Sequence, residues 1–170
     1  MLPEIEDLLE KMEAHRTELL AILEGLSSEA AEGHPDGEWS AKQQVAHLVQ
    51  AEPTWVDWAR TVHDEPGTAV GQTPDEGQIF LQDVDTADNR PLSWWLERLR
   101  ETRAETLKGL EEMRLSSNEA LGRAGRHRTF GDMNVLQFLR ALYRHDRMHM
   151  DQLTGREQTF VPRQASGDTE

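Results

Sequence analysis

The pattern of hydrophobic positions along the chain predicts four amphipathic helices. Apolar side chains recur every three or four residues, which is the spacing that places them on one face of an α-helix. This spacing covers residues 3–26, 41–62, 92–113 and 132–154. Four helical stretches of this length, joined by connections of unequal length, predict an all-α fold, namely a four-helix bundle.

Local signals mark some of the helix ends. Ser40 and Ser93 are candidate N-caps, because a serine oxygen can accept a hydrogen bond from the first helical turn. Gly155 is a good C-terminal stop. Pro53 departs from the pattern, since a proline inside a helix removes one backbone hydrogen bond. We therefore expect the second helix to be kinked or interrupted near residues 49–53.

The connections between the predicted helices are unequal. Residues 65–90 are rich in proline, glycine and acidic residues and contain one short apolar cluster at residues 79–81. A connection of this length is usually functional or holds a short helix, and it means that the helices need not simply alternate in direction. Residues 114–131 form a second connection, and no segment has a strong strand pattern. We expect one domain, residues 1–155, followed by a polar tail, residues 156–170.

The charge of the chain argues against two classes of binding partner, nucleic acids and anionic membranes. Lysine and arginine number 18 against 32 aspartate and glutamate residues, so the net charge is −14. Nucleic acids and anionic membrane surfaces both attract basic surfaces, and this chain offers none. No stretch approaches the roughly 20 apolar residues that span a bilayer, and the acidic start does not resemble a signal peptide. We expect a cytoplasmic protein with a small-molecule substrate. Because the chain has no cysteine, any metal must bind to His, Asp or Glu.

Two histidines lie on the apolar side of the last predicted helix. His145 and His149 are four residues apart, so one imidazole stacks above the other. Asp146 falls in the same apolar arc and Gln152 at its border, whereas Asp151 belongs to the opposite, polar face. Buried polar groups need partners, and a metal ion would satisfy the pair. The alternatives are a hydrogen-bonded core pair or a surface pair.

The second predicted helix offers a third candidate ligand. His47 lies at one edge of the apolar arc and Glu52 at the other. Alone, His47 is a boundary histidine, but three imidazoles together leave a fourth coordination position open for water or substrate. Glu52 and Asp146 could act as a base or orient a ligand histidine, and Glu52 could equally be a solvated residue. The other histidines are expected on the surface: His15, His34, His63 and His127.

The residues around these histidines resemble a known family. Residues 39–52 read WSAKQQVAHLVQAE, and residues 130–153 read FGDMNVLQFLRALYRHDRMHMDQL. A Trp-Ser pair before a helix that carries His-Leu, with a later His-x3-His-x2-Gln run, is similar to the DinB-like, or YfiT-like, superfamily of four-helix bundles. The resemblance covers the domain from about residue 5 to residue 155.

The resemblance implies a divalent metal, commonly zinc or nickel, on His47, His145 and His149. It also implies a homodimer and thiol-dependent transfer or hydrolysis, with low-molecular-weight thiols such as mycothiol or bacillithiol as co-substrates. We therefore expect a metal-dependent transferase or hydrolase, with Glu52 and Asp146 as candidate catalytic carboxylates. Two alternatives stay open: a non-catalytic metal-binding or stress-associated interaction protein, and a bundle whose histidines bind nothing.

Overall fold

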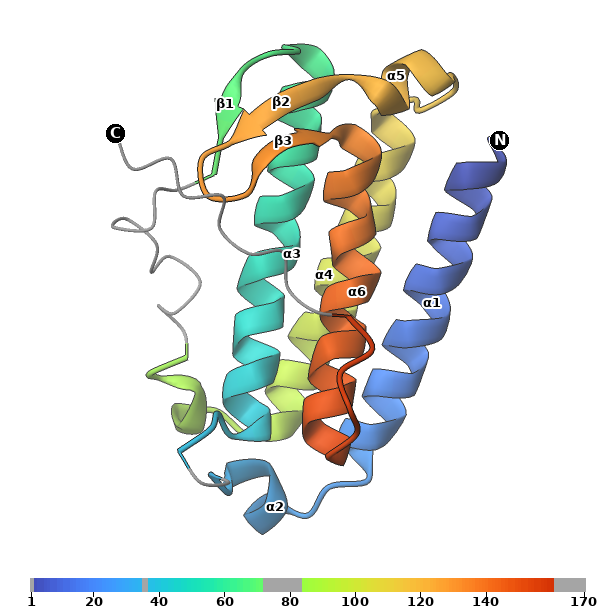
Figure 1. The fold of residues 1–170 in the computed structure, drawn as a ribbon. Coiled ribbons are helices and arrows are strands. Elements are labelled where there is room, and N and C mark those ends of the chain that lie inside the picture. The colour runs from blue at the N-terminus through green and yellow to red at the C-terminus, as the bar shows by residue number, and fades with distance from the viewer. Residues whose placement is uncertain (1, 35–36, 72–83, 161–170) are drawn as a thin grey trace.

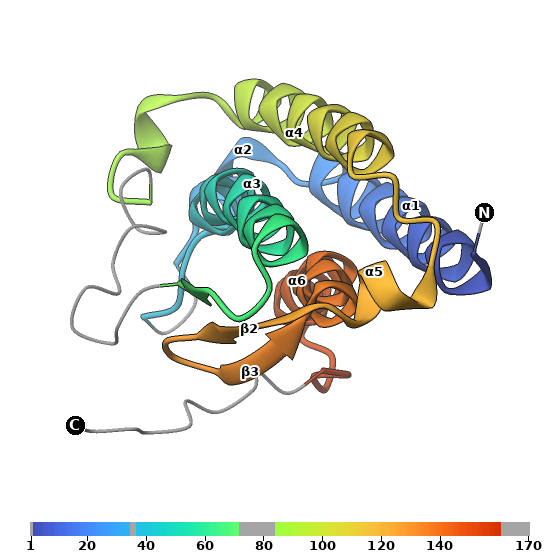
Figure 2. The ribbon, with the colours of Figure 1, turned by 90° about the horizontal axis from the view of Figure 1, so that it is seen from above.

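Four long helices build the molecule, which we describe from a computed structural model over residues 2–34, 37–71 and 84–160. The periodicity predicted all four helices, and the all-α four-helix bundle is confirmed (Figure 1). In the views of Figures 1 and 2, α3 packs beside α4 and α6, and α6 packs beside α1. The long helices are α1 (Pro3–Glu24), α3 (Ala41–Asp64), α4 (Leu92–Glu112) and α6 (Val135–Thr154).

The directions of the helices do not alternate. In Figure 1, α1 and α6 run downward, whereas α3 and α4 both run upward and are neighbours. Two parallel neighbours require the chain to return from one end of the bundle to the other between them, which explains the long connection. Shorter helical turns lie in the connections: α2 (Ser28–Glu32), η2 (Ala87–Asn89) and α5 (Asn118–Gly122).

A small sheet covers one end of the bundle, although no segment of the sequence has a strong strand pattern. The strands are β1 (Ala69–Val70), β2 (Ala124–His127) and β3 (Gly131–Asn134). β2 pairs in parallel with β1 and antiparallel with β3. Such short strands cannot show the alternation that identifies a strand in a sequence. Gly125 lets β2 approach α3, because a Cβ there would lie 2.6 Å from Cγ2 of Val62.

Three of the predicted helix ends can be compared with the structure. Ser40 caps α3, and Gln43 completes a capping box by accepting the Ser40 backbone N–H. Ser93 does not cap α4, whose N-cap is Pro91. The last helix begins at Val135 rather than at residue 132, because the preceding residues pair in β3 and Asn134 forms the N-cap.

Pro53 does not interrupt α3, so the interruption expected near residues 49–53 is not found. The helix continues from Ala41 to Asp64 with the proline inside it. Residues on both sides of Pro53, such as Ala51 and Val56, are buried. Tertiary packing of this kind supplies most of the stability of a helix in a protein and can offset one lost hydrogen bond. The apolar cluster at residues 79–81 lies outside the described residues.

The apolar core consists of two clusters. The first lies towards the sheet and includes Met12, Val56, Leu110 and Leu142. The second lies towards the opposite end and includes Leu19, Leu48, Leu99 and Met150. Each long helix carries one buried charged side chain between its residues of the first cluster and its residues of the second. We call these four side chains the polar layer: Arg16, Glu52, Arg103 and Asp146.

Residues 156–160 return along the bundle after α6. The backbone N–H of Thr159 donates to a carboxylate oxygen of Asp151 at 2.8 Å, and the rings of Phe160 and Tyr143 lie 6.0 Å apart. Asp151 is fully buried, although the helix wheel places it on the polar face. The helix wheel places a residue relative to its own helix and cannot foresee a later segment that covers it.

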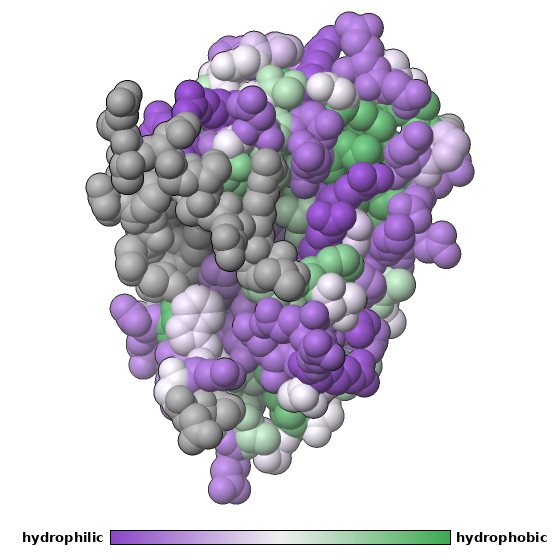
Figure 3. Space-filling model, viewed as in Figure 1, coloured by the Kyte–Doolittle hydropathy of each residue, from purple (hydrophilic) through white to green (hydrophobic). Residues whose placement is uncertain are grey.

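The side chains visible on one face of the molecule are largely polar (Figure 3). The face drawn in Figure 3 is mostly hydrophilic, with hydrophobic residues in small separate groups. Among the helices that the structure describes, none has the length and apolar character needed to cross a membrane.

Candidate metal centre

Three histidines from two helices converge between α3 and α6. The Nε2 atom of His145 lies 3.0 Å from Nε2 of His47 and 3.2 Å from Nε2 of His149. One nitrogen from each ring falls within 4.8 Å of the other two, which makes these residues a group that could hold a metal ion. Residues 98 positions apart in the sequence, His47 and His145, therefore meet at one point.

The spacing of these nitrogens suits a divalent ion. Zinc binds imidazole nitrogens at about 2.0–2.1 Å in a tetrahedral arrangement, which separates neighbouring nitrogens by about 3.3 Å. Hydrogen bonds among the rings are a poorer explanation, because Nε2 of His145 faces two ring nitrogens and offers either one proton or one lone pair. An ion satisfies all three lone pairs, and three ligands leave a coordination position open.

Gln44 orients His149 from outside the cluster. The Gln44 amide donates from Nε2 to the carbonyl oxygen of Trp39 at 3.2 Å, which leaves its Oε1 as an acceptor. That oxygen lies 3.0 Å from Nδ1 of His149, so Nδ1 carries the proton and the lone pair of Nε2 faces the other histidines. Trp39 also packs on the ring of His47, with centroids 5.0 Å apart.

The surroundings keep the imidazoles of His145 and His149 neutral. Burial lowers the pKa of His149 to about 3, the proximity of His47 acts in the same direction, and a hydrogen bond with Gln152 opposes it. Burial likewise lowers the pKa of His145 well below its ordinary value, with further contributions from His149, His47 and Arg16. A neutral imidazole is the form that binds a metal, so protons compete weakly for these nitrogens near neutral pH.

Glu52 and Asp146, the two candidate catalytic carboxylates, lie in the polar layer. All of their hydrogen bonds within the described part of the chain go to Arg16 and Arg103. Burial acts to raise the pKa of Glu52, but the charges and hydrogen bonds of the two arginines outweigh it and lower that pKa. A carboxylate held ionised in this way is a weak base, and a catalytic role for either residue stays a prediction.

The sequence analysis did not identify three residues that contribute to this region. Gln44, Arg16 and Arg103 were not assigned a role, although the helix periodicity contains a signal for the arginines. Arg16 follows Met12 by four residues and precedes Leu19 by three, so it stands on the buried stripe of α1. A cation on such a stripe requires an anionic partner. Nothing in the sequence pattern identifies the bond between Gln44 and His149.

The remaining histidines behave differently from one another. His34 is exposed as expected, and His15 and His63 are partly buried. His127 is only 2% exposed, so its expected surface position is wrong. Its ring stacks on the rings of Trp55 and Phe130, and its Nδ1 accepts the backbone N–H groups of Thr129 and Phe130. The strand β2, which the sequence did not predict, carries His127 into the core.

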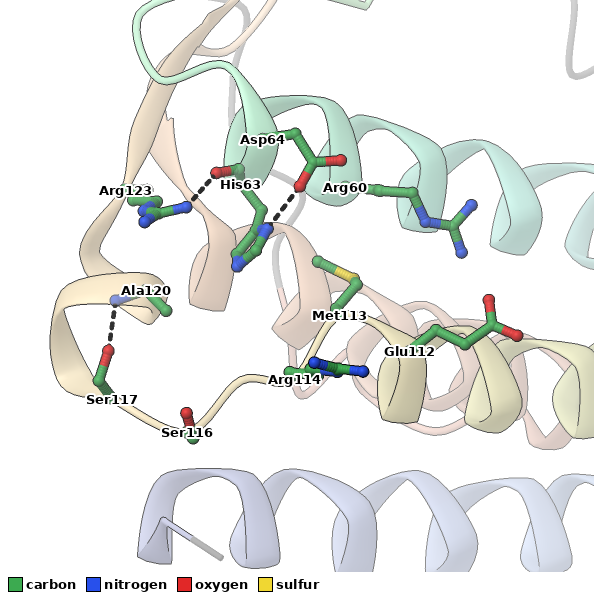
Figure 4. Close-up of a pocket in the computed structure, with 10 residues that line it drawn as sticks. All are labelled: Arg60, His63, Asp64, Glu112, Met113, Arg114, Ser116, Ser117, Ala120 and Arg123. Atoms are coloured by element: carbon green, nitrogen blue, oxygen red, sulfur yellow. Dashed lines mark hydrogen bonds and ion pairs between the residues drawn. The ribbon is translucent and has the colours of Figure 1, made fainter.

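A hollow lies at the end of α3 opposite to His47. It has a volume of about 560 Å³ and lies where α3 and α4 both end (Figure 4). Arg123 donates to the carbonyl oxygen of His63 at 2.7 Å, in the last turn of α3, where the helix dipole places partial negative charge. We interpret Arg123 as stabilising this helix end. The lining residues are Arg60, His63, Asp64, Glu112, Met113, Arg114, Ser116, Ser117, Ala120 and Arg123.

Comparisons with known proteins agree with this fold. The family model of the DinB superfamily matches residues 3–153. YfiT from Bacillus subtilis, described as a probable metal-dependent hydrolase with an unusual four-helix bundle topology, has a similar structure. Its TM-score is 0.67 at 18% sequence identity, over 92% of this chain and 91% of that chain. No curated protein matches the chain. The family match extends over nearly the whole bundle, and the chain therefore belongs to the DinB superfamily.

Proposed function

We propose that this protein is a divalent-metal-dependent enzyme whose metal ligands are His47, His145 and His149. One observation carries the proposal: three imidazole nitrogens converge at distances that suit a single ion. The reaction class that fits best is transfer to, or hydrolysis of, an electrophilic small molecule. Membership of the DinB superfamily and the likeness to YfiT, a probable metal-dependent hydrolase, support this class.

The three-histidine set decides the chemistry that is available. A divalent ion with an open position, when bound, acts as a Lewis acid that makes a water or a thiol a nucleophile near neutral pH. Hydrolysis and thiol-dependent transfer both begin in this way, and they differ in which nucleophile enters. Zinc and nickel both suit imidazole ligands, so the ligand set alone leaves both metals as candidates.

In this scheme the surrounding residues would orient the ligand histidines and bind the substrate. Gln44 fixes the proton on Nδ1 of His149 and so presents Nε2 to the centre. Trp39, beside His47, supplies an aromatic surface next to the site on which an apolar part of a substrate can pack. In this proposal Glu52 and Asp146 are ion-pair partners in the buried layer of charged side chains and do not touch the substrate. The alternative is that one of them acts as a base.

The metal content of the protein tests the first half of the proposal. Protein produced without a histidine tag should contain about one zinc or nickel ion per chain by elemental analysis. His149→Ala should lose that metal, because a ligand is removed. Ser93→Ala, on the exposed side of α4, is the matched control and should keep it. Wild-type protein that binds no divalent metal would sink the proposal and favour a bundle whose histidines bind nothing.

Activity tests the second half. The metal-loaded protein should act either on electrophiles in the presence of a low-molecular-weight thiol or on ester and amide substrates, and a chelator should abolish turnover. Dependence on the added thiol separates transfer from hydrolysis. Stoichiometric metal without turnover over a broad panel would instead support the second candidate function, a non-catalytic metal-binding or interaction protein. The homodimer implied by the family and the cytoplasmic location expected from the composition stay predictions. Sedimentation can test the first.

A further inference from the structure

The polar layer joins all four long helices through charged groups. Arg16 comes from α1, Glu52 from α3, Arg103 from α4 and Asp146 from α6, and each side chain is at most 5% exposed. Two cations and two anions make the set electrically balanced. Balance of this kind is what allows charges to be buried, because an unpaired buried charge costs several kcal/mol.

The contacts within the layer form a closed ring. Arg16 contacts Glu52 at 2.5 Å and Asp146 at 2.9 Å. Arg103 contacts the same two carboxylates at 2.7 Å and 2.9 Å. Each arginine also donates to a main-chain carbonyl of the other arginine's helix, at Leu99 from Arg16 and at Met12 from Arg103. The planar guanidinium suits such multiple bonding, which a lysine cannot reproduce.

The layer ties together the two helices that carry the histidines. Asp146 directly follows His145 on α6, and Glu52 lies five residues after His47 on α3. Both carboxylates are held by the same two arginines, which come from α1 and α4. A shift of α3 relative to α6 by one turn would separate Glu52 and Asp146 from these arginines and would also separate His47 from His145. The layer therefore opposes the movement that would open the histidine cluster.

We propose that Arg16 and Arg103 are positioning residues for the three-histidine site, although neither contacts a ligand nitrogen. This inference rests on the proposed metal site and deepens it. The arginines fix the register of α3 against α6, and the distances among the three Nε2 atoms follow from that register. In a simpler alternative the layer stabilises the fold and has no particular effect on the site.

The sign of the effect of Arg103 on metal affinity separates these alternatives. Through charge alone, replacing Arg103 by a neutral residue should strengthen the binding of a cation. Loss of register should weaken it. Arg103 is a better choice than Arg16 for this test, because the charge of Arg16 acts directly on His145. We therefore choose Arg103→Gln, which keeps hydrogen-bonding capacity and removes the guanidinium.

The experiment is a titration of the metal-free full chain with Co²⁺, read by visible absorption, which reports coordination geometry. Arg103→Gln should weaken binding about 10–100-fold, as loss of outer orienting groups commonly does, and should alter the spectrum. Leu139→Ala is the matched control: Leu139 is a fully buried residue of the first cluster on α6, so its loss lowers stability without touching the layer. It should keep the wild-type affinity and spectrum.

Two further comparisons complete the design. If Arg103→Gln does not fold, Arg103→Lys keeps the charge with fewer bonds and should show a smaller loss in the same direction. Wild-type affinity and spectrum in the folded Arg103 variant, or an equal change in Leu139→Ala, would overturn the positioning role. Wild-type protein that binds no Co²⁺ would instead overturn the proposed function itself, so the two failures are distinguishable.

Discussion

At the scale of single residues, the amide of Gln44 decides how His149 faces the other two rings. The amide nitrogen donates to the carbonyl oxygen of Trp39, and the amide oxygen accepts a hydrogen bond from Nδ1 of His149. This double use assigns the amide orientation and the imidazole tautomer from the hydrogen bonds alone. A ring that is held in this way enters a metal site without losing further rotational freedom.

We predict that Gln44→Leu weakens metal binding about 10–100-fold, in line with the usual effect of removing an outer partner of a ligand histidine. Gln44→Glu keeps an acceptor for Nδ1 and serves as the control, with affinity close to that of the wild type. Competition with a chelating dye measures both. Equal affinities for the leucine and wild-type proteins would show that Gln44 does not orient the ring.

The titration of the buried imidazoles gives a second prediction at this scale. The pKa of His149 is lowered to about 3 and that of His145 well below its ordinary value. Below the ordinary value of about 6.5 the unfolded chain therefore binds more protons than the folded chain. The free energy of unfolding should fall as the pH decreases below about 6.5, by up to about 1.4 kcal/mol per pH unit for each ring.

Urea denaturation of the metal-free protein between about pH 7 and pH 5 measures this slope. Glu52 does not affect the slope in this pH range. Its pKa is lowered from an ordinary value near 4.5, so its contribution to stability is lost only at lower pH. His149→Gln removes one titrating ring and should make the slope shallower, whereas the other histidines are the same in both proteins. An unchanged slope would mean that His149 does not stay neutral in the folded chain.

At the scale of elements, local sequence signals determine the four long helices, whereas tertiary structure determines the sheet and some of the helix ends. The apolar stripes predicted four helices because each helix buries one face. The sheet and the start of α6 were missed, because the short strands lack a periodic pattern. Residues 132–134 have the pattern of the helix that follows, but they pair in β3. The two serines that looked alike as caps illustrate the same limit, since only the structure shows that Ser40 caps and Ser93 does not.

This difference gives a matched pair of variants. Ser40→Ala should lower the free energy of unfolding by about 1 kcal/mol, because it removes the acceptor for the backbone N–H of Gln43. Ser93→Ala should change it by less than about 0.5 kcal/mol, as expected for an exposed position. Thermal or urea denaturation of the three proteins gives both numbers. Similar losses in the two variants would contradict the assignment of the caps.

At the scale of the whole molecule, the sequence predicted more of the histidine cluster than of its support. The spacing of His145 and His149 and the edge position of His47 were readable, and the structure brings the three rings together. The polar layer was not foreseen as a unit, because it forms only when four helices meet. Glu52 and Asp146 were noticed separately, and their arginine partners lie 36 to 130 residues away along the chain.

The parallel arrangement of α3 and α4 has a consequence for how the chain can be divided. The segment up to α3 contributes Arg16, Glu52 and His47, and the segment from α4 onward contributes Arg103, Asp146, His145 and His149. Each fragment thus brings one positive and one negative charge, and neither brings a complete ligand set. A chain cut between these helices would form two complementary pieces whose reassociation a metal ion should favour, as in a split reporter that responds to metal.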